Sequence, residues 1–254
     1  MIKERRVYKS CFFLLLMPEQ TNLIIQLREQ LAKEGNSKLA ENYKKYLKSP
    51  YAFYGIRVPR LRQIAKEYKN LDFYSALNLF DELWQSNNHE EMSLALFLLS
   101  FYTNKHGNEI WKFLLERAER AKSWDHIDEL SAHTLGKILA SNLSLMPEIK
   151  KMAESKNLWI RRTSIVSTCH LIKQNKLELT FLLVEKLVYD EDIYVQKAAG
   201  WMLREAGKRN RLVVRDFILR HLKMKNFAFS YATEKMKELR QIRKEQQEKE
   251  KAKK

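Results

Sequence analysis

The sequence predicts an all-α protein built from stacked helix pairs, and three observations support this prediction. Only 6 Gly and 4 Pro occur in the 254 residues, so few positions interrupt a helix. Apolar residues recur at helical spacing along most of the chain, and no segment shows the alternation that is typical of a strand. A sequence motif also repeats at a fixed step, which indicates a repeat architecture.

The apolar spacing places the first helices along the chain. Their buried faces are expected at Leu23, Leu27 and Leu31; at Leu61, Ile64, Ala65 and Tyr68; at Leu94, Leu98 and Phe101; and at Ile110, Phe113 and Leu114. Segments of about 12–18 residues with this period are typical of amphipathic helices. Short polar turns such as 105–108 join them. Trp84 and Trp111 are expected in the core, since a Trp on an amphipathic helix is usually buried.

The repeat becomes visible further along the chain. The segment that begins Asn157-Leu-Trp-Ile-Arg-Arg aligns with Asp192-Ile-Tyr-Val-Gln-Lys, so Trp159 matches Tyr194 at a step of 35 residues. The same step backwards reaches Trp124 and then His89. In both segments an aromatic residue is followed by an aliphatic residue and two basic or polar residues. This pattern resembles the start of the second helix in a HEAT-like repeat. The expected architecture is therefore a curved α-solenoid, with the second helices lining its concave surface.

Three segments are expected in the chain. Residues 1–16 contain Lys and Arg followed by a short apolar run that resembles a signal peptide, but Pro18 and Glu19 stand where small cleavage-site residues belong. We interpret 1–16 as an N-terminal extension that is not part of the native protein, residues 17–235 as a single HEAT-like repeat domain, and 236–254 as a charged helical or frayed tail. No segment has the roughly 20 apolar residues of a membrane span. The sequence thus predicts a soluble, cytoplasmic protein.

The charge balance indicates a polyanionic partner. The chain carries 47 Lys and Arg against 31 Asp and Glu, a net charge of +16. Lys235 to Lys254 contribute nine basic residues and four Glu, so the tail accounts for only part of the excess. A basic folded body is typical of nucleic-acid binding, and a charge kept for solubility is the alternative. Cys11 and Cys169 cannot build a disulfide framework or a multi-thiolate zinc site, and the six His residues lack metal-ligand spacing.

Four residues fall on one stripe when the repeat is projected at about 100° per residue. With Trp124, Trp159 and Tyr194 at the same phase, Trp124 lies at about 0° and Asp128 at about 40°. Arg162 then lies near about −60° and Trp201 near about −20°, on the next two repeats. The sequence therefore predicts two aromatic side chains, a carboxylate and a guanidinium along neighbouring second helices. Taken alone, Asp128 could instead pair locally with Lys122 or Arg161.

These residues occur in segments that resemble a known family. Phe53 to Arg62, Ser123 to Asp128, Leu158 to Arg162 and Val195 to Glu205 are similar to the AlkD-type DNA alkylation repair glycosylases, a family of HEAT-like repeats. The resemblance spans residues 20–235. It implies that Trp124, Asp128, Arg162 and Trp201 form the active site. In the family, a Trp and an Asp four residues apart, then an Arg, then a Trp within Gly-Trp-x-Leu-Arg-Glu hold these roles.

The resemblance also implies an activity. AlkD-type enzymes hydrolyse the N-glycosidic bond of cationic alkylated purines such as 7-methylguanine and 3-methyladenine in duplex DNA, with the lesion left in or near the base stack. Asp128, Trp124 and Trp201 are then expected to be catalytic. Arg162, Arg161, Lys197 and Arg204 are expected to bind DNA, with Arg162 on a flanking phosphate. The expected protein is a monofunctional glycosylase, a monomer that needs neither metal nor cofactor.

Two alternatives stay open from the sequence. The chain could be a non-catalytic HEAT-like scaffold that binds DNA or an acidic protein. A carboxylate at the centre of a surface that only binds phosphate would repel the DNA backbone, so the presence of Asp128 favours the enzyme. A glycosylase for a different lesion is the second alternative, which the sequence does not separate from the first interpretation.

Overall fold

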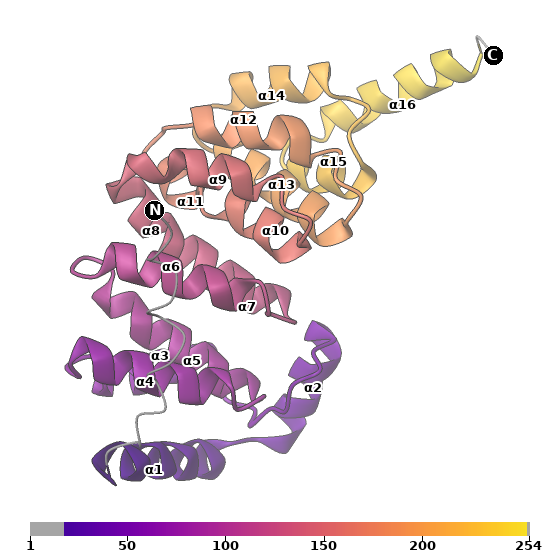
Figure 1. Cartoon of the computed structure of the whole chain (residues 1–254). Coiled ribbons are helices and arrows are strands. Elements are labelled where there is room, and N and C mark those ends of the chain that lie inside the picture. The colour runs from indigo at the N-terminus through magenta and orange to yellow at the C-terminus, as the bar shows by residue number, and fades with distance from the viewer. Residues whose placement is uncertain (1–17, 253–254) are drawn as a thin grey trace. The chain divides into compact units, whose positions relative to one another are not determined.

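The computed structural model describes residues 18–252, with side chains from residue 22 onward, and consists of helices joined by turns and loops (Figure 1). The described residues form no strand and contain one isolated parallel bridge, between Ala52 and Asn88. The predicted all-α class is thus confirmed. The extension expected at 1–16 lies outside the described residues. None of the described helices is long and apolar enough to cross a membrane.

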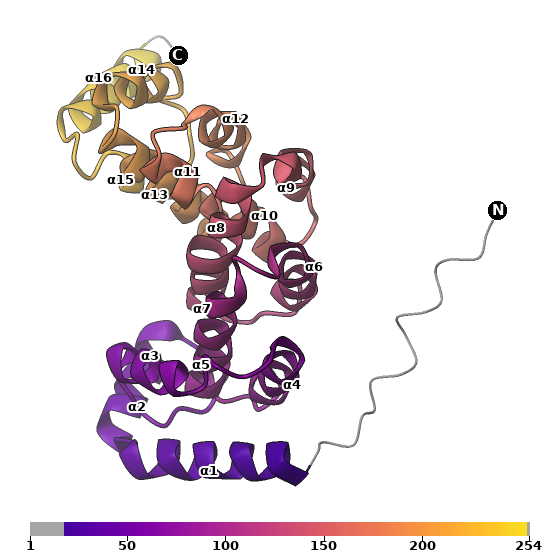
Figure 2. The ribbon, with the colours of Figure 1, turned by 90° about the vertical axis from the view of Figure 1, so that its left-hand side faces the viewer.

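The described residues form two compact units, and each is described by itself. Unit 1 runs to Tyr46 and includes Tyr51–Leu98, whereas unit 2 comprises Leu47–Pro50 and the chain from Leu99 onward. The helices of unit 1 are α1 (Pro18–Glu34), α2 (Ser37–Leu47), α3 (Val58–Glu67), α4 (Phe73–Trp84) and α5 (His89–Leu99), the last residues of α2 and α5 belonging to unit 2. In unit 1, α1 lies beneath α3 and α4 (Figure 2).

Local sequence explains where the helices of unit 1 begin. Asp72 caps α4, because its carboxylate accepts hydrogen bonds from the backbone N–H groups of Tyr74 and Ser75. The side chain of Asn88 caps α5 in the same way, accepting from the N–H groups of Glu90 and Glu91. Every residue of α5 from His89 to Leu99 is buried, so this helix is covered on all sides.

A buried carboxylate fixes the turn that leads into α3. Glu90 is 1% exposed and accepts hydrogen bonds from the backbone N–H groups of Tyr54 (3.1 Å), Gly55 (2.8 Å) and Ile56 (3.2 Å). Gly55 has a φ of 84°, and a Cβ there would lie 2.0 Å from the carbonyl oxygen of Asn36. Only glycine fits this close approach. One acidic side chain therefore satisfies three donors of a turn that has no helix or strand of its own.

Removal of this carboxylate is expected to destabilise the protein strongly. Glu90→Ala leaves three donors without their acceptor, and we expect the free energy of unfolding to fall by about 3 kcal/mol. Urea denaturation followed by circular dichroism measures this change. Glu29→Ala, on the exposed side of α1, is the control and is expected to change stability by less than about 0.5 kcal/mol. Equal stability of the two variants would contradict the role given to Glu90.

Unit 2 continues the helical pattern with short pairs. Its elements are η1 (Ser100–Tyr102), α6 (Gly107–Ala118), α7 (Trp124–Glu129), η2 (Leu130–Leu135), α8 (Gly136–Ser141), η3 (Leu143–Leu145), α9 (Met146–Met152), α10 (Leu158–Val166), α11 (Cys169–Lys173), α12 (Glu178–Leu187), α13 (Ile193–Gly207), α14 (Arg211–Arg220), α15 (Asn226–Ala232) and α16 (Glu238–Lys251). Contacts link α7 to α10, α10 to α13 and α13 to α15, so the second helices of successive repeats stack. The curvature expected of the solenoid stays a prediction.

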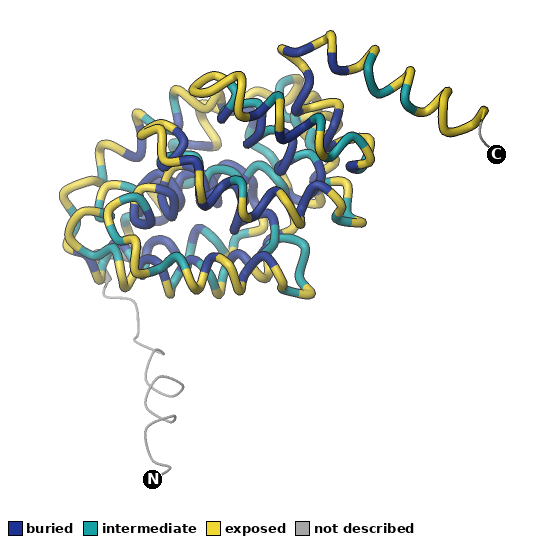
Figure 3. Tube along the Cα trace, turned by 90° about the horizontal axis from the view of Figure 1, so that it is seen from above, coloured by how far each residue is buried: buried dark blue, intermediate teal, exposed yellow. Residues whose placement is uncertain are grey.

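Most of the apolar faces lie where the helical spacing predicts them, but the burial expected of Phe101 is wrong: it is 42% exposed, because α5 ends at Leu99 and Phe101 lies in η1. Leu27, Leu61 and Leu98 are at most 1% exposed. Buried and exposed positions alternate along many of the helices in Figure 3, whereas the residues of α16 are mostly exposed. Trp111 is 1% exposed, and its Nε1 donates to Glu148 at 2.9 Å, which confirms its predicted core position. Trp84 is half-buried and stacks on Phe80.

A polar seam lies within unit 2, where η2 and α8 approach α10. The π-helical turn η2 follows α7 without a break, and a Cβ on Gly136 would lie 2.9 Å from the carbonyl oxygen of Ser167. The buried side-chain atoms of this region that lack a hydrogen-bond partner among the described residues are the hydroxyls of Ser131, Thr134, Thr163 and Ser167 and the Nε2 of His170. Burial, helped by nearby cations such as Lys173, lowers the pKa of His170 to about 4.

The lowered pKa of His170 makes stability depend on pH. The unfolded chain takes up a proton on this side chain near its ordinary pKa of 6.5, whereas the folded chain does so only near 4. Acid therefore favours the unfolded chain, and the free energy of unfolding is expected to fall as the pH is lowered from 7 towards 4. His170→Gln should show a smaller fall over this window by urea denaturation, and His106→Gln is the control. A wild-type pH dependence in His170→Gln would refute this assignment.

Candidate active site

The centre of the candidate site is an ion pair between two neighbouring helices. Asp128 lies on α7 and Arg162 on α10. Nε and Nη2 of Arg162 each donate to one carboxylate oxygen of Asp128, both at 2.8 Å. Nη1 of Arg162 donates to the backbone carbonyl of Tyr194 on α13. One guanidinium thus joins the second helices of three successive repeats, as the helical projection predicts for Asp128 and Arg162.

Burial sets the electrostatics of this pair. The side chain of Arg162 is 6% exposed and that of Asp128 is 16% exposed. Burial raises the pKa of the Asp128 carboxyl above its ordinary value, and the charge and hydrogen bonds of Arg162 oppose this shift. The guanidinium of Arg162 balances the charge of the Asp128 carboxylate. A carboxylate that is held in place and still reaches the surface can interact with positive charge that develops beside it.

The two tryptophans predicted for the site lie on the same helices. Trp124 is the first residue of α7, four residues before Asp128, and Trp201 lies on α13, seven residues after Tyr194; both are half-buried. Gly200 precedes Trp201, and a Cβ there would lie 2.3 Å from the backbone carbonyl oxygen of Ala228 on α15. Gly200 therefore allows α13 to pack closely on α15. The direct approach of both tryptophans to the Asp128–Arg162 pair stays a prediction.

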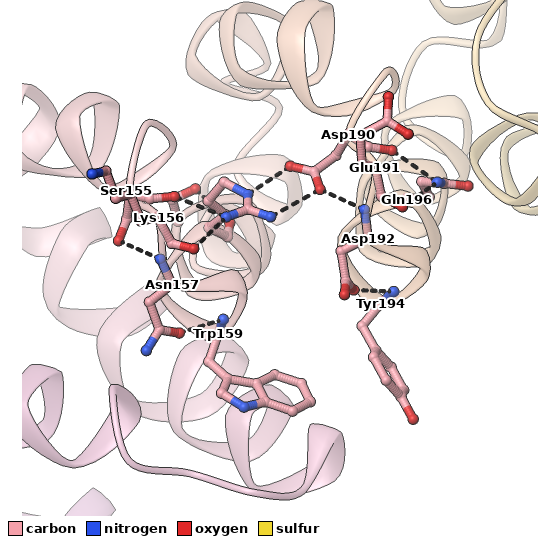
Figure 4. A network of polar contacts seen from close by, with 11 residues as sticks. Ser155, Lys156, Asn157, Trp159, Asp190, Glu191, Asp192, Tyr194 and Gln196 are labelled. Atoms are coloured by element: carbon pink, nitrogen blue, oxygen red, sulfur yellow. Dashed lines mark hydrogen bonds and ion pairs between the residues drawn. The ribbon is translucent and has the colours of Figure 1, made fainter.

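The other residues predicted to bind DNA have partners inside the protein. Arg161 forms a bidentate ion pair with Asp190, at 2.6 and 3.0 Å, and its Nη1 donates to the backbone carbonyl groups of Ser155 and Lys156 (Figure 4). Arg204 pairs with Glu234 and, at 3.5 Å, with Glu205.

Lys197 differs from these arginines. Its Nζ lies 5.1 Å from the ring centroid of Phe227 and 5.9 Å from that of Tyr194, and no carboxylate of the described residues pairs with it. Phosphate binding by Arg161, Arg162, Lys197 and Arg204 stays a prediction. Of these four residues, Lys197 alone forms no ion pair with a carboxylate of the described residues.

Sequence reasoning missed the groups that hold these arginines. The backbone carbonyl of Tyr194 and the carboxylate of Asp190 were not among the candidate residues. A signal for Asp190 does exist in the sequence, because Asp190-x-Asp192 precedes α13 as Ser155-x-Asn157 precedes α10. In both, the first side chain accepts from the backbone N–H of the second residue. No sequence pattern identifies the backbone carbonyl of Tyr194 as the acceptor of a hydrogen bond from Arg162.

The fold and the site define a class of protein: helical repeats whose second helices are joined by a paired carboxylate and guanidinium. The model of the DNA alkylation repair enzyme family matches residues 27–236. The chain therefore belongs to the DNA alkylation repair enzyme family. No curated protein matches the chain.

Solved structures share the fold at low identity. A predicted DNA alkylation repair enzyme from Enterococcus faecalis aligns with a TM-score of 0.70 at 20% identity, covering 80% of this chain and 97% of its own. AlkD2 from Streptococcus mutans aligns with a TM-score of 0.62 at 18% identity, covering 84% and 97%. At these identities the likeness shows the fold, and the family assignment rests on the family model.

Disruption of the ion pair is expected to destabilise the fold. Arg162→Gln leaves Asp128 buried without its partner, and we expect the free energy of unfolding to fall by about 3 kcal/mol. The double variant Asp128→Asn with Arg162→Gln has no uncompensated charge and is expected to recover part of this loss. Urea denaturation of the wild type, the single variants Asp128→Asn and Arg162→Gln, and the double variant completes a double-mutant cycle. An additive cycle would show that the two side chains do not interact.

Proposed function

We propose that this protein is a monofunctional DNA glycosylase that hydrolyses the N-glycosidic bond of cationic alkylated purines, of the 7-methylguanine and 3-methyladenine type, in duplex DNA. The observation that carries this proposal is the Asp128 carboxylate, held by Arg162 at the stripe where the sequence also places Trp124 and Trp201. Membership of the DNA alkylation repair enzyme family supports DNA as the partner.

The reaction needs little acid catalysis. An alkylated purine already carries positive charge, so the electron pair of the breaking C1′–N bond neutralises the departing base. Positive charge develops on the deoxyribose, and water then adds to C1′ and loses a proton. Stabilisation of this sugar cation is the main task of the protein.

Asp128 is the group proposed for that task. A carboxylate about 4 Å from the developing charge contributes about 4 kcal/mol at an effective dielectric constant near 20. Asp128 also positions the attacking water and accepts its proton. Arg162 orients the carboxylate and opposes the rise in its pKa, because both of its hydrogen bonds to Asp128 favour the charged form.

The two tryptophans serve the sugar rather than the base. Their π-faces pack against the deoxyribose and share in stabilising the cation. The family resemblance supports a lesion that stays in or near the base stack while the protein holds the backbone, which would allow bulky adducts. A complex with a stable lesion analogue tests this. A modified base enclosed in a protein pocket would refute it.

A non-catalytic helical scaffold is the second candidate function. The observation that favours it is that both oxygens of Asp128 are already bonded to Arg162, which a purely structural ion pair would also show. A buried pair of this kind seldom stabilises a fold more than apolar residues of the same size would, so stability alone does not explain it.

Base release measured with the wild type and Asp128→Asn decides between these functions. We expect wild-type protein to release 7-methylguanine from duplex DNA, and Asp128→Asn to lower the rate at least about 100-fold. DNA binding by Asp128→Asn should be retained, since the change removes negative charge. Asp216→Asn, at an exposed position on α14, is the matched control and should release base at the wild-type rate. Tight, salt-sensitive binding without release of 7-methyl, 3-methyl or bulkier bases by the wild type would favour the scaffold.

A further inference from the structure

Aromatic residues line up at the beginnings of three successive second helices in unit 2. Trp159 is the second residue of α10, Tyr194 the second of α13 and Phe227 the second of α15. The ring centroids of Trp159 and Tyr194 are 5.4 Å apart, and Nζ of Lys197 lies over the rings of both Tyr194 and Phe227. We call Trp159, Tyr194, Lys197 and Phe227 the aromatic ladder.

A network of polar contacts fixes the first two rings. The side chains of Asn157 and Asp192 cap their helices by accepting from the backbone N–H groups of Trp159 (2.8 Å) and Tyr194 (2.7 Å). Arg161 then ties the two loops together through Asp190 and the backbone carbonyl of Ser155. In Figure 4, the rings of Trp159 and Tyr194 extend away from these polar contacts. The ladder is therefore preorganised before any ligand arrives.

The ladder is continuous with the candidate active site. The backbone carbonyl of Tyr194 accepts a hydrogen bond from Arg162, which also holds Asp128. Trp159 stands one repeat after Trp124 and at the same phase of its helix. The aromatic positions thus lead from the site along α10, α13 and α15.

Exposure and charge indicate that the ladder meets a ligand. Phe227 is 43% exposed, and its neighbour in space, Lys197, has no carboxylate partner among residues 22–252. Packing within the protein alone does not require a lysine between two aromatic rings. Aromatic faces alternating with a cation are typical of surfaces that bind nucleic-acid strands, since rings pack on sugars and bases while the cation meets a phosphate.

We propose that the aromatic ladder binds the DNA on one side of the lesion, with its rings against the sugars and base edges and Lys197 on a phosphate. This inference rests on the proposed function, because it assigns the residues that contact the DNA substrate beside the candidate active site. It adds Trp159, Tyr194 and Phe227 to the residues that contact DNA. Arg161 acts through the two loops and is a positioning residue.

Binding to one-sided duplexes tests the ladder. Two duplexes carry the same stable abasic-site analogue near one end, so that paired DNA extends only to its 5′ side or only to its 3′ side. We expect Phe227→Ser to weaken binding at least about fivefold for one of them and to leave the other unchanged. Lys197→Gln should weaken binding to the same duplex and lower the slope of log K against log salt concentration by about one. Leu212→Ser, at a 72% exposed position on α14, is the matched control.

The outcomes separate this inference from the proposed function. Equal binding of wild type and both ladder variants to the two duplexes would overturn the ladder, whether or not the protein releases base. The same variants are therefore also titrated with unmodified duplex DNA. If the wild type releases no base but Phe227→Ser and Lys197→Gln still weaken binding to the unmodified duplex, the proposed function fails and the ladder stands as a DNA-binding surface.

Discussion

The ion pair between Asp128 and Arg162 is the interaction on which the site depends. All three side-chain nitrogen atoms of Arg162 donate hydrogen bonds within the protein, two to Asp128 and one to the backbone carbonyl of Tyr194. The pair therefore connects α7, α10 and α13, and Arg162 opposes the rise in the pKa of Asp128 that burial causes. A fold could replace such a pair by apolar residues at little cost, so stability alone does not explain the pair, and the proposed chemistry gives it a role.

Close backbone approaches keep the helices near enough for this arrangement. The chain contains only 6 Gly, and Gly55, Gly136 and Gly200 all stand where a Cβ would lie less than 3.0 Å from a backbone oxygen. Gly200 is the residue before Trp201, so the position of this tryptophan and the packing of α13 on α15 are set together. At these three positions the missing side chain is what allows two segments to approach closely.

The four basic residues predicted to bind DNA differ in how their charges are used. Arg161, Arg162 and Arg204 pair with carboxylates and organise loops and helices, which suits the planar, bidentate guanidinium group. Lys197 pairs with none of the described carboxylates and lies among aromatic rings. A net charge of +16 therefore does not identify the residues that meet DNA, because much of the arginine charge is balanced inside the fold.

The sequence by itself determined the helical class, the repeat and the register that brings Asp128 towards Arg162, because helical periodicity and a 35-residue step follow from local spacing alone. It also predicted the core position of Trp111. Only the tertiary structure decided which partner Asp128 takes, since the sequence also allowed a local pair with Lys122 or Arg161. It also revealed the turn held by Glu90 and the carbonyl that binds Arg162. Such partners lie more than 30 residues away in the chain, and a backbone carbonyl leaves no mark in the sequence.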